Sequence, residues 1–457
     1  MHYYDDTVAA ISTAYGKGGV ALIRVSGPSA LEICQRVFLP KSGKRVLDLA
    51  AGQCVYGDII KDGRVIDDGL LTVFRAPRSF TGEDVVELSC HGGILLTSRV
   101  LEALFDAGAR QAEAGEFSKR AFLNGKTSLT ESEAVIDRIN AENDSQLRLS
   151  SNTAVRRLSA ECAGIYNDLV ALLASAYVYT DYPDEDLSDL SNEQLLQGLC
   201  AVRTRLEGLL ASYKAGRAVM EGIPTAILGK PNTGKSSLLN LLLKRERAIV
   251  SPVAGTTRDT VEESALLGRV TLRLADTAGI HQTGDLVESI GIARSLEKLK
   301  EAELVFAVFD MSRPAEEEDE ALIARLLEKD CPVIALLNKC DLEKSFDLAL
   351  PEHFLQIEMS CKQGLPPALE ETVARLFETE RINYDDSAVL TSARQAAAAK
   401  RAIALIDSAM DALDMGLTQD VAALDAELAL AEIGEIDGRT VGEDIVSAIF
   451  SRFCVGK

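Results

Sequence analysis

The sequence predicts a multidomain protein: an α+β domain at the N-terminus, an α-helical domain in two halves, and an α/β domain inserted between them. The length of 457 residues suggests about three domains. An Ala- and Leu-rich helical texture occurs twice, and strands alternate with helices between the two occurrences. The inserted part also contains the phosphate-loop pattern G-x-x-x-x-G-K-[ST], as GKPNTGKS at 229–236. We place the four segments at 1–120, 121–216, 217–380 and 381–457.

The N-terminal segment mixes short strands with helices. Its strand-like runs are rich in β-branched residues and are bounded by Gly, Asp or Pro. Asp62-Gly63 is a typical hairpin-turn dipeptide between two such runs. The expected elements are a strand at 20–27, a helix at 28–38, a hairpin over 53–76 and a strand at 85–93. Together they predict an α+β domain.

The two helical halves show long apolar periodicity with few Gly or Pro residues, over 130–180 and from about 387 to the end. Thr130 followed by Glu133 resembles a capping box at the start of a helix. A polar stretch at 180–191 interrupts the first half. Each half alone is too thin for a core, so we expect the two halves to pack together. Three independent domains in series are the alternative.

The inserted segment carries apolar, β-branched runs separated by helical patterns. Runs of this kind are typical of a parallel sheet covered on both faces. The expected strands are 223–228, 270–276, 304–310, 331–339 and 353–360.

Composition excludes several classes of protein. The net charge of −22 argues against general nucleic-acid binding, which needs clustered Lys and Arg. Nine Cys without a C-x-x-C pair indicate reduced thiols in a cytoplasmic protein. Every apolar run is shorter than the roughly 18 residues of a membrane span, so we expect no membrane association. His91 lies in no metal-ligand spacing, so we expect no metal site there.

The GKPNTGKS loop follows a predicted strand and precedes a helical run, which is the context that a phosphate loop requires. Its backbone N–H groups can surround phosphate, the Lys can reach the β- and γ-phosphates, and the first Ser hydroxyl can bind Mg²⁺. The nucleotide-binding residues expected in this loop are Asn232, Thr233, Gly234, Lys235, Ser236 and Ser237.

A second motif, DTAG, follows the predicted strand at 270–276. An Asp at a strand end can hold the Mg²⁺ shell through water, and the Gly N–H can meet the γ-phosphate. On its own this tetrapeptide is common in ordinary turns. It lies 41 residues after Lys235, however, and this spacing allows both motifs to follow strands of the same sheet. The expected contacts are Asp276, Thr277, Ala278 and Gly279.

A third motif, NKCD, ends the predicted strand at 331–339. The carboxylate of Asp341 can accept hydrogen bonds from the N1–H and amino group of guanine, which adenine cannot offer. Asn338 and Lys339 would brace the base and its loop. The backbone N–H groups after the next strand would meet the guanine carbonyl, at Ser360, Cys361 and Lys362. These ordered motifs indicate a protein that binds and hydrolyses GTP.

Several stretches resemble one family over the whole chain. GTTRD at 255–259 and the motifs above are similar to the GTPases of the Era and TrmE group. FCVGK at 453–457 resembles the C-I-G-K end of the tRNA modification GTPases called MnmE or TrmE. GKGGVALIRVSG at 16–27, SFTGEDVVELSCHGG at 79–93 and GEFSKRAFLNGK at 115–126 match the same family.

The resemblance implies how GTP is hydrolysed. Ile280 stands where Ras-type proteins carry a water-orienting Gln, and the family implicates Glu288 and a bound K⁺ instead. On sequence alone Glu288 belongs to a solvated helix face. K⁺-aided dimerisation of two nucleotide domains would drive turnover, although Pro252 stiffens the K⁺ loop. The K⁺ ligands carried over are Asn232, Ser251, Val253 and Thr256, the Mg²⁺ ligands are Ser236 and Thr257, and Ser251, Thr256 and Thr257 join the GTP contacts.

The resemblance also implies that the N-terminal domain has the folate-binding fold of aminomethyltransferases and binds 5-formyltetrahydrofolate. Arg and Lys suit the glutamate tail of a folate, and a carboxylate suits the pterin amines. Without the resemblance each such residue is an ordinary surface charge. The residues carried over are Arg24, Glu87, Lys126 and Lys457.

Cys454 allows three interpretations. The resemblance makes it a candidate for modification chemistry near the folate. Its place four residues from the end would also suit a prenylation box, although Gly456 and a terminal Lys fit that box poorly. The third interpretation is a buried structural thiol.

The function implied is that of a K⁺-dependent GTP hydrolase working with the FAD-dependent MnmG (GidA). The pair would add an aminomethyl or carboxymethylaminomethyl group to C5 of the tRNA wobble uridine. We expect a homodimer, a heterotetramer or larger assembly with the partner, and tRNA held largely by that partner. The alternative is an Era-like switch in ribosome assembly, but Era-like proteins carry a basic RNA-binding module where this chain has an acidic helical end.

Overall fold

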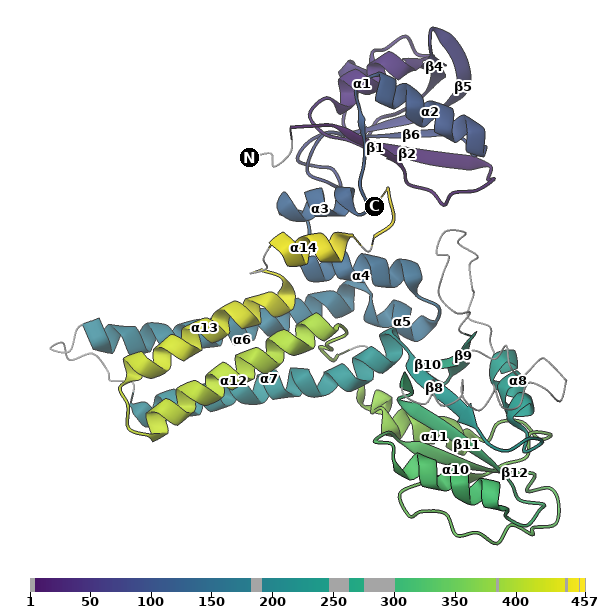
Figure 1. Ribbon diagram of the computed structural model, residues 1–457. Helices are drawn as coiled ribbons and strands as arrows, with labels where there is room; N and C mark the ends of the chain where they lie inside the picture. The colour runs from purple at the N-terminus through teal and green to yellow at the C-terminus, as the bar shows by residue number, and fades with distance from the viewer. Residues whose placement is uncertain are drawn as a thin grey trace. The chain divides into compact units, whose positions relative to one another are not determined.

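The chain forms two compact units (Figure 1), namely 1–136 with 437–457, and 137–436. The computed structural model describes residues 5–181, 191–245, 263–274, 301–383, 386–439, 443–451 and 453–456. The limits of these two units differ from the limits of the four predicted segments. The boundaries at 120, 216 and 380 therefore remain a prediction. Within the described residues, no helix is both long and apolar enough to cross a membrane.

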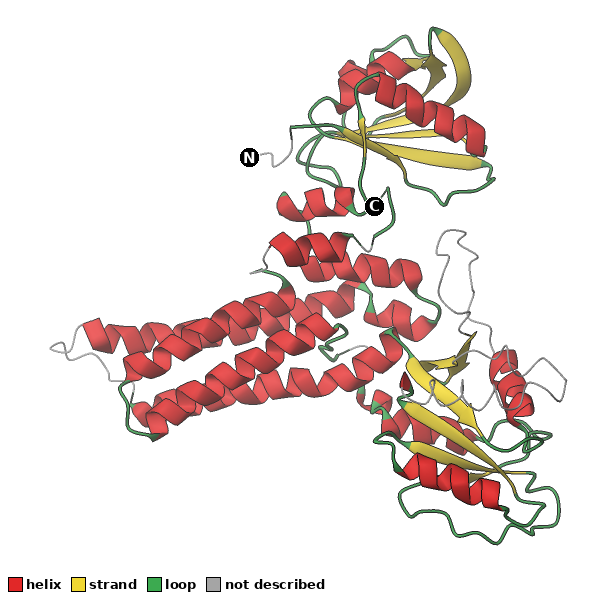
Figure 2. Ribbon diagram, viewed as in Figure 1, coloured by secondary structure: helices red, strands yellow, loops and turns green. Residues whose placement is uncertain are grey.

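The first unit is built on a seven-stranded sheet with the order β3-β4-β5-β6-β2-β1-β7. All neighbours are antiparallel except β1 and β7. The strands are β1 (Val8–Ile11), β2 (Val20–Ser26), β3 (Phe38–Pro40), β4 (Cys54–Lys61), β5 (Arg64–Phe74), β6 (Val85–His91) and β7 (Arg110–Gln111). Helices α1 (Ala30–Val37) and α2 (Ile94–Asp106) cover one face, and a 3₁₀ turn spans Val46–Asp48 (Figure 2).

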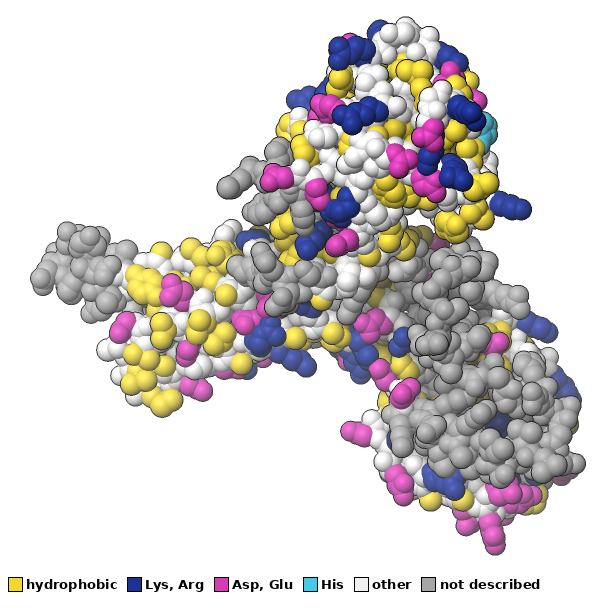
Figure 3. Space-filling model, turned by 45° about the horizontal axis from the view of Figure 1, so that its top comes forward, with side chains coloured by type: hydrophobic (Ala, Val, Ile, Leu, Met, Phe, Trp, Pro, Cys, Tyr) yellow, Lys and Arg dark blue, Asp and Glu magenta, His cyan; other side chains and the backbone are white. Residues whose placement is uncertain are grey.

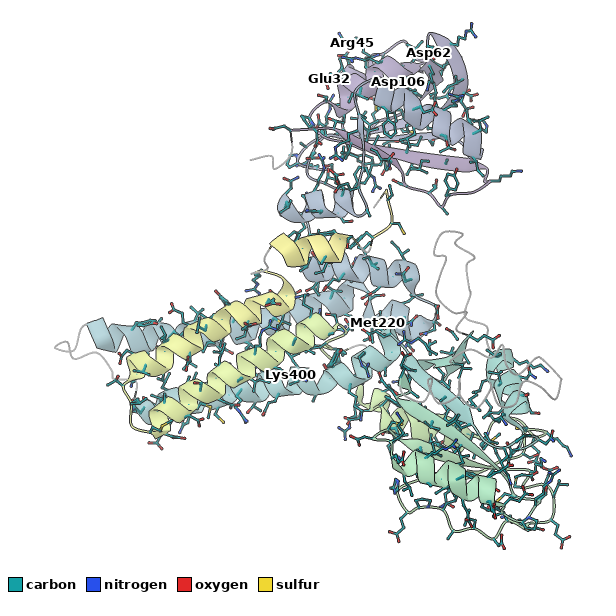
Figure 4. All side chains as sticks on the ribbon, viewed as in Figure 1. Glu32, Arg45, Asp62, Asp106, Met220 and Lys400 are labelled. Carbon is teal, nitrogen blue, oxygen red and sulfur yellow. The ribbon has the colours of Figure 1, made fainter. Side chains whose placement is uncertain are left out.

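The expected elements of this sheet are present. The strand predicted at 20–27 is β2, the helix predicted at 28–38 is α1, and the strand predicted at 85–93 is β6. The predicted hairpin is β4–β5, with Asp62 at its tip (Figure 4). Asp62 and Gly63 have φ of 51° and 71°, and two left-handed residues in succession are what a type I′ turn requires.

The first unit also contains α3 (Glu116–Leu123), α14 (Glu443–Phe450) and most of α4 (Leu129–Asn140). They share a small apolar core around Leu129, Phe450 and Phe453. The predicted capping box at Thr130 is wrong by two residues. Ser128 Oγ accepts the Glu131 N–H at 3.1 Å and Glu131 Oε2 accepts the Ser128 N–H at 2.8 Å, because the helix begins one residue before Thr130.

The second unit contains a bundle of four long helices: α6 (Asn152–Asp181), α7 (Asn192–Met220), α12 (Ala393–Asp414) and α13 (Gln419–Asp437), with the short α5 (Asp144–Leu149) before α6. Leu206 of the first half and Ile406 of the second are both fully buried in one core. Ala398, Ala402 and Ala409 on α12 let the helices approach closely. The two helical halves therefore pack together, and the alternative of three separate domains is wrong for these segments.

Helix α7 ends where the inserted α/β domain begins, at Met220 (Figure 4). The side-chain amide of Gln146 donates to the carbonyls of Val219 and Met220 at 3.1 and 3.2 Å. Arg217 forms an ion pair with Glu303, which precedes a central strand of the inserted domain. These contacts hold the end of the helix against the sheet that follows it.

The inserted domain has a six-stranded sheet with the order β13-β12-β11-β8-β10-β9. The strands are β8 (Ile223–Leu228), β9 (Glu263–Leu267), β10 (Val270–Leu274), β11 (Leu304–Asp310), β12 (Val333–Asn338) and β13 (Leu355–Glu358). Separate apolar cores lie on its two faces, as expected for a covered sheet. The helices are α8 (Lys235–Arg245), α10 (Glu317–Leu327) and α11 (Pro367–Leu376), with a 3₁₀ turn at Thr379–Arg381.

The predicted parallel sheet is confirmed for the five expected strands, and the structure adds an antiparallel strand at one edge. The five expected strands are parallel to their neighbours, but β9 is antiparallel to β10 and was not expected. A tight turn at Gly268, with φ of 62°, joins the pair. This turn lets the chain reverse its direction between β9 and β10.

Candidate functional site

Polar groups gather at one edge of the inserted sheet. Strands β8, β11, β12 and β13 run parallel, so their carboxyl ends meet at that edge. The phosphate-loop pattern follows β8, Asp310 ends β11, Asn338 ends β12 and Ser360 follows β13. In an open α/β sheet this edge is where ligands bind.

The backbone of the loop after β8 is shaped by left-handed residues. Gly229, Asn232 and Gly234 have φ of 153°, 63° and 108°. A Cβ atom on Gly234 would lie 2.1 Å from Nδ2 of Asn338, so only Gly fits between the two loops. Left-handed residues in a loop of this kind let backbone N–H groups converge on a phosphate.

Lys235 lies folded against its own loop. Its Nζ donates to the carbonyls of Gly229 and Lys230 at 2.8 and 2.6 Å, and burial lowers the pKa of its ammonium group. Nucleotide phosphates would give this cation stronger acceptors than carbonyls. The hydroxyls of Ser236 and Ser237 are on exposed residues in the first turn of α8, whose N-terminus favours anions.

Asn338 connects three loops of the site. This residue is buried, its Nδ2 donates to the Thr233 carbonyl at 2.7 Å, and its Oδ1 accepts the Cys361 N–H at 3.1 Å. The Cys361 thiol lies 3.9 Å from the Gly234 carbonyl. One amide side chain thus joins the phosphate loop to the two loops expected to hold the base.

Asp341 is exposed at the same edge with its carboxylate ionised. A hydrogen bond from Ser360 is the main cause that lowers the pKa of this carboxyl, and Lys362 at 3.4 Å lowers it further. The Cys340 N–H donates to the Met359 carbonyl at 3.2 Å and fixes the loop to the end of β13. An anchored carboxylate beside backbone N–H groups suits the N1–H, amino and carbonyl groups of guanine.

Asp310 and Lys230 at this edge were not predicted from the sequence, whereas their neighbour Lys339 was. Lys339, with φ of 65°, places Nζ 2.5 Å from Oδ2 of the nearly buried Asp310. Burial raises the pKa of Asp310, but the hydrogen bonds from Lys339 and Ser312 outweigh it and the pKa is lowered. Lys230 of the phosphate loop lies 2.5 Å from the buried Asp319 at the start of α10. The position of Asp310 at the end of a predicted strand could have identified it as a residue of this site.

Several predicted residues cannot be compared with the structure because they lie outside the described residues. They include the expected switch, K⁺ and hydrolytic positions. These are Ser251, Val253, Thr256, Thr257, Asp276, Thr277, Ala278, Gly279, Glu288 and, in the N-terminal site, Lys457.

A second group of predicted residues lies on the N-terminal sheet. Arg24 of β2 and Glu87 of β6 are directly opposite in the antiparallel register. The guanidinium donates twice to Glu87 Oε1, at 2.8 and 3.1 Å, and lies 4.9 Å above the ring of Phe80. Lys126 Nζ donates to the Pro77 carbonyl at 2.9 Å, so it lies beside the loop that carries Phe80. The structure brings Arg24 and Glu87 together and puts Lys126 on an adjacent loop.

The C-terminal tail runs beside this sheet. Val455 pairs with Ala114, and Ser12 Oγ donates to the Gly456 carbonyl at 3.0 Å. Cys454 is exposed, so the interpretation as a buried structural thiol is wrong. The end of the described tail lies next to strand β1, whose neighbour β2 carries Arg24.

The fold and the strand-end loops define the class: a phosphate-loop protein whose second loop is built to recognise guanine, that is, a GTPase. A family model described as "GTP-binding protein TrmE N-terminus" matches residues 7–126, and one described as "MnmE helical domain" matches residues 129–454.

The full length of the chain is similar to curated relatives. The tRNA modification GTPase MnmE of Lactococcus lactis subsp. cremoris is 40% identical over 99% of this chain and 98% of its own. That of Geobacillus thermodenitrificans is 39% identical over 99% of each. A solved structure of Aquifex aeolicus Era covers 40% of this chain and 65% of its own at 25% identity, with a TM-score of 0.25 that is too low to add support. The chain belongs to the MnmE (TrmE) family of tRNA modification GTPases.

Proposed function

We propose that this protein hydrolyses GTP in order to modify tRNA, adding an aminomethyl or carboxymethylaminomethyl group to C5 of the wobble uridine. An FAD-dependent partner of the MnmG (GidA) type would act with it. The main observation behind the proposal is the pair of hydrogen bonds made by Asn338, which joins the phosphate loop to the loop expected to bind guanine. This occurs in a chain that belongs to the MnmE family. The inserted domain is called the G domain below.

In the proposed nucleotide site, Asp341 binds the guanine edge and backbone N–H groups after β13 bind its carbonyl. Asn338 and the ion pair of Lys339 with Asp310 hold that loop in place. Lys235 would leave the carbonyls of its own loop for the β- and γ-phosphates. Asn338 already fixes the loop for the base to the phosphate loop, which supports this assignment because less has to be ordered on binding. The Cys361 N–H, which donates to Asn338, would be shared with the guanine carbonyl.

The cations of the proposal are Mg²⁺ and K⁺. The exposed hydroxyl of Ser236 at the start of α8 fits a Mg²⁺ ligand, and Thr257 is the second proposed ligand. The exposed Asn232, with its side-chain amide, fits a K⁺ ligand together with Ser251, Val253 and Thr256. Such cations offset the negative charge that develops between the β- and γ-phosphates. Glu288 would assist hydrolysis, since Ile280 cannot orient water.

K⁺ dependence is tested by steady-state GTP turnover in matched KCl and NaCl buffers at constant ionic strength. We expect faster turnover in KCl, and Asn232→Ala should remove most of the difference. Equal turnover of the unaltered protein in the two salts would contradict the K⁺ part of the proposal while leaving GTP hydrolysis intact.

The proposed binding site for 5-formyltetrahydrofolate is the Arg24–Glu87 face, that is, the face of the N-terminal sheet opposite α1 and α2. Glu87 would receive the pterin amines, and Arg24 and Lys126, with Lys457, would receive the glutamate tail. The aromatic ring of Phe80 below Arg24 supports a site for a flat ligand. The exposed Cys454 is proposed to take part in the modification chemistry, and full modification by Cys454→Ser would exclude it.

The proposed assembly is a homodimer joined by the partner into a heterotetramer or larger complex, in the cytoplasm. The chain carries a net charge of −22, and Figure 3 shows Asp and Glu side chains spread among the Lys and Arg on its surface. This balance supports a partner that supplies most of the surface that holds tRNA.

The function is tested by reconstitution with purified partner, unmodified tRNA, folate, GTP and KCl. We expect wobble uridine modification that requires all components, detected by mass spectrometry of the nucleosides. A protein that hydrolyses GTP but yields no modified uridine in the complete mixture would contradict the proposed role in tRNA modification.

A further inference from the structure

A cluster of polar side chains lies at the end of the N-terminal sheet, apart from the residues proposed for folate. It consists of Asp67 and Asp68 of β5 and His91 of β6. Nδ1 of His91 lies 2.8 Å from Oδ1 of Asp67, and one ligand atom from each of the three residues lies within 4.8 Å of the other two. The side chain of Asp67 is 9% exposed and that of His91 is 66% exposed. The cluster can therefore be reached from solvent at the imidazole.

The register of the sheet is irregular directly beside the two successive carboxylates. In the β4–β5 ladder Ile59 pairs with Asp67, but Ile60 pairs with Val65, so β5 carries one extra residue at Ile66. In a regular strand Asp67 and Asp68 would point to opposite faces. A bulge redirects side chains, and such irregularities are frequent next to functional sites.

The ladder between β5 and β6 stops just before the cluster. Its last pair is Leu70 with Ser89, and beyond it the His91 N–H donates to Oδ2 of Asp67 at 2.9 Å. The hydroxyl of Tyr56 on β4 donates to Oδ2 of Asp68 at 2.8 Å. Each carboxylate is thus oriented by a neighbour and keeps lone pairs for a further ligand, as carboxylates that bind metals do.

We propose that Asp67, Asp68 and His91 bind a divalent transition-metal ion of the Zn²⁺, Co²⁺ or Mn²⁺ type. One imidazole nitrogen with two carboxylate oxygens suits ions of this kind, whereas Ca²⁺ and Mg²⁺ favour all-oxygen sites. The ion replaces the proton shared by His91 and Asp67. It connects β5 to β6 at a point where backbone pairing has ended, and water fills the remaining coordination positions.

The test uses the full-length protein, free of nucleotide and metal, titrated with CoCl₂ and followed by calorimetry and by absorption. Thiolate ligation of Co²⁺ gives an intense near-ultraviolet band, which separates binding by cysteine from binding by nitrogen and oxygen. The variants are Asp67→Asn and His91→Gln. The matched controls are His353→Gln, a histidine of the G domain, and Asp48→Asn, an exposed acid at the end of the 3₁₀ turn Val46–Asp48. Far-UV circular dichroism checks that each variant is folded.

We expect one Co²⁺ bound per chain without a thiolate band, and at least about 100-fold weaker binding in Asp67→Asn and His91→Gln, since removing a ligand costs more than removing an outer partner. Both controls should bind as the unaltered protein does. Three results would each overturn the proposal: no binding at millimolar Co²⁺, binding with the full thiolate band, or binding unchanged in both cluster variants.

Discussion

The two sheets of the molecule hold their candidate sites in different places. The parallel sheet of the G domain has an apolar core on each face, so its polar groups lie at strand ends. The antiparallel sheet of the first unit has α1 and α2 on one face and α3 packed through Phe117 on part of the other. On that second face Arg24 and Glu87 lie opposite each other in the middle of two strands. The position of the covering helices therefore decides whether a ligand site can lie on the face of a sheet or only at the ends of its strands.

The two sites also differ in how far they are formed before a ligand arrives. In the G domain the loops are already joined by neutral hydrogen bonds through Asn338, and the ionised Asp341 lies beside them. On the N-terminal sheet Arg24 and Glu87 satisfy each other, so a folate has to exchange one ion pair for new contacts. We therefore expect single substitutions to have larger effects on GTP binding than on folate binding.

The largest expected effect is on the base contact in the G domain. Asp341→Asn removes two hydrogen bonds to a charged acceptor, each worth about 1.5–3 kcal/mol, so GTP affinity should fall by about 10²- to 10⁴-fold. The measurement is calorimetric titration with GTP and with xanthosine triphosphate, whose altered base edge suits Asn. Glu343→Gln, a nearby exposed acid, is the control. A change of less than threefold for GTP would remove Asp341 from the base contact.

The second effect concerns the ion pairs that support the N-terminal sheet. Arg120 has no exposed side-chain surface and lies within 3.3 Å of carboxylate oxygens of Asp6, Glu83 and Glu116. Arg120→Met leaves buried carboxylates without this cation and should lower the free energy of unfolding of the first unit by about 3–5 kcal/mol. Chemical denaturation measures it.

The control for this change is Arg99→Met, which breaks an exposed pair with Glu102. It should alter the free energy of unfolding by less than about 1 kcal/mol. Equal losses of unfolding free energy in the two variants would show that burial does not determine the strength of these ion pairs. That result would contradict the structural role assigned to the buried Arg120.

The third effect tests folate binding at the Arg24–Glu87 face of the N-terminal sheet. Glu87→Gln keeps the shape of the side chain but loses one charged acceptor, so the affinity for 5-formyltetrahydrofolate should fall about 10- to 100-fold. Fluorescence or calorimetric titration measures the change, with Glu102→Gln on α2 as the control. Unchanged folate affinity, with the circular dichroism spectrum preserved, would move the folate site away from Glu87.

The smallest expected effect is a response to acid. Burial raises the pKa of Glu116, but hydrogen bonds from Arg110, the Glu113 N–H and Arg120 outweigh it, so its pKa lies below the ordinary 4.5. A lowered pKa means that the unfolded chain binds more protons, so this stabilisation is present above about pH 4.5 and is lost as pH falls through the folded pKa. The difference in unfolding free energy between the unaltered protein and Glu116→Gln should therefore shrink from pH 7 to pH 3. A difference that grows toward acid would reverse the sign of this argument.

Much of the G domain could be predicted because its chemistry is local in sequence. The phosphate loop and NKCD each lie within eight residues, directly after an apolar strand, and the structure places both at one sheet edge. Asp310 was missed because a single Asp after a strand forms no motif, although its position matched the others. The antiparallel β9 was missed because it is only five residues long and a single Gly-containing turn separates it from β10.

Less of the N-terminal site could be predicted, because its side-chain contacts are made between different strands. The pairing of Arg24 with Glu87 depends on a register that no short motif states. Likewise the contact of His91 with Asp67 and Asp68 is made between two strands, and no short stretch of the sequence signals it. The capping box was placed at Thr130 rather than Ser128 because both positions are followed three residues later by Glu.

The most direct test of the account asks whether guanine recognition at Asp341 drives tRNA modification. The complete reconstitution is run with the unaltered protein and with Asp341→Asn, each supplied with either GTP or xanthosine triphosphate. We predict modified wobble uridine only for the unaltered protein with GTP and for the variant with xanthosine triphosphate. Equal modification by both proteins with GTP, or modification without any nucleotide, would contradict the account.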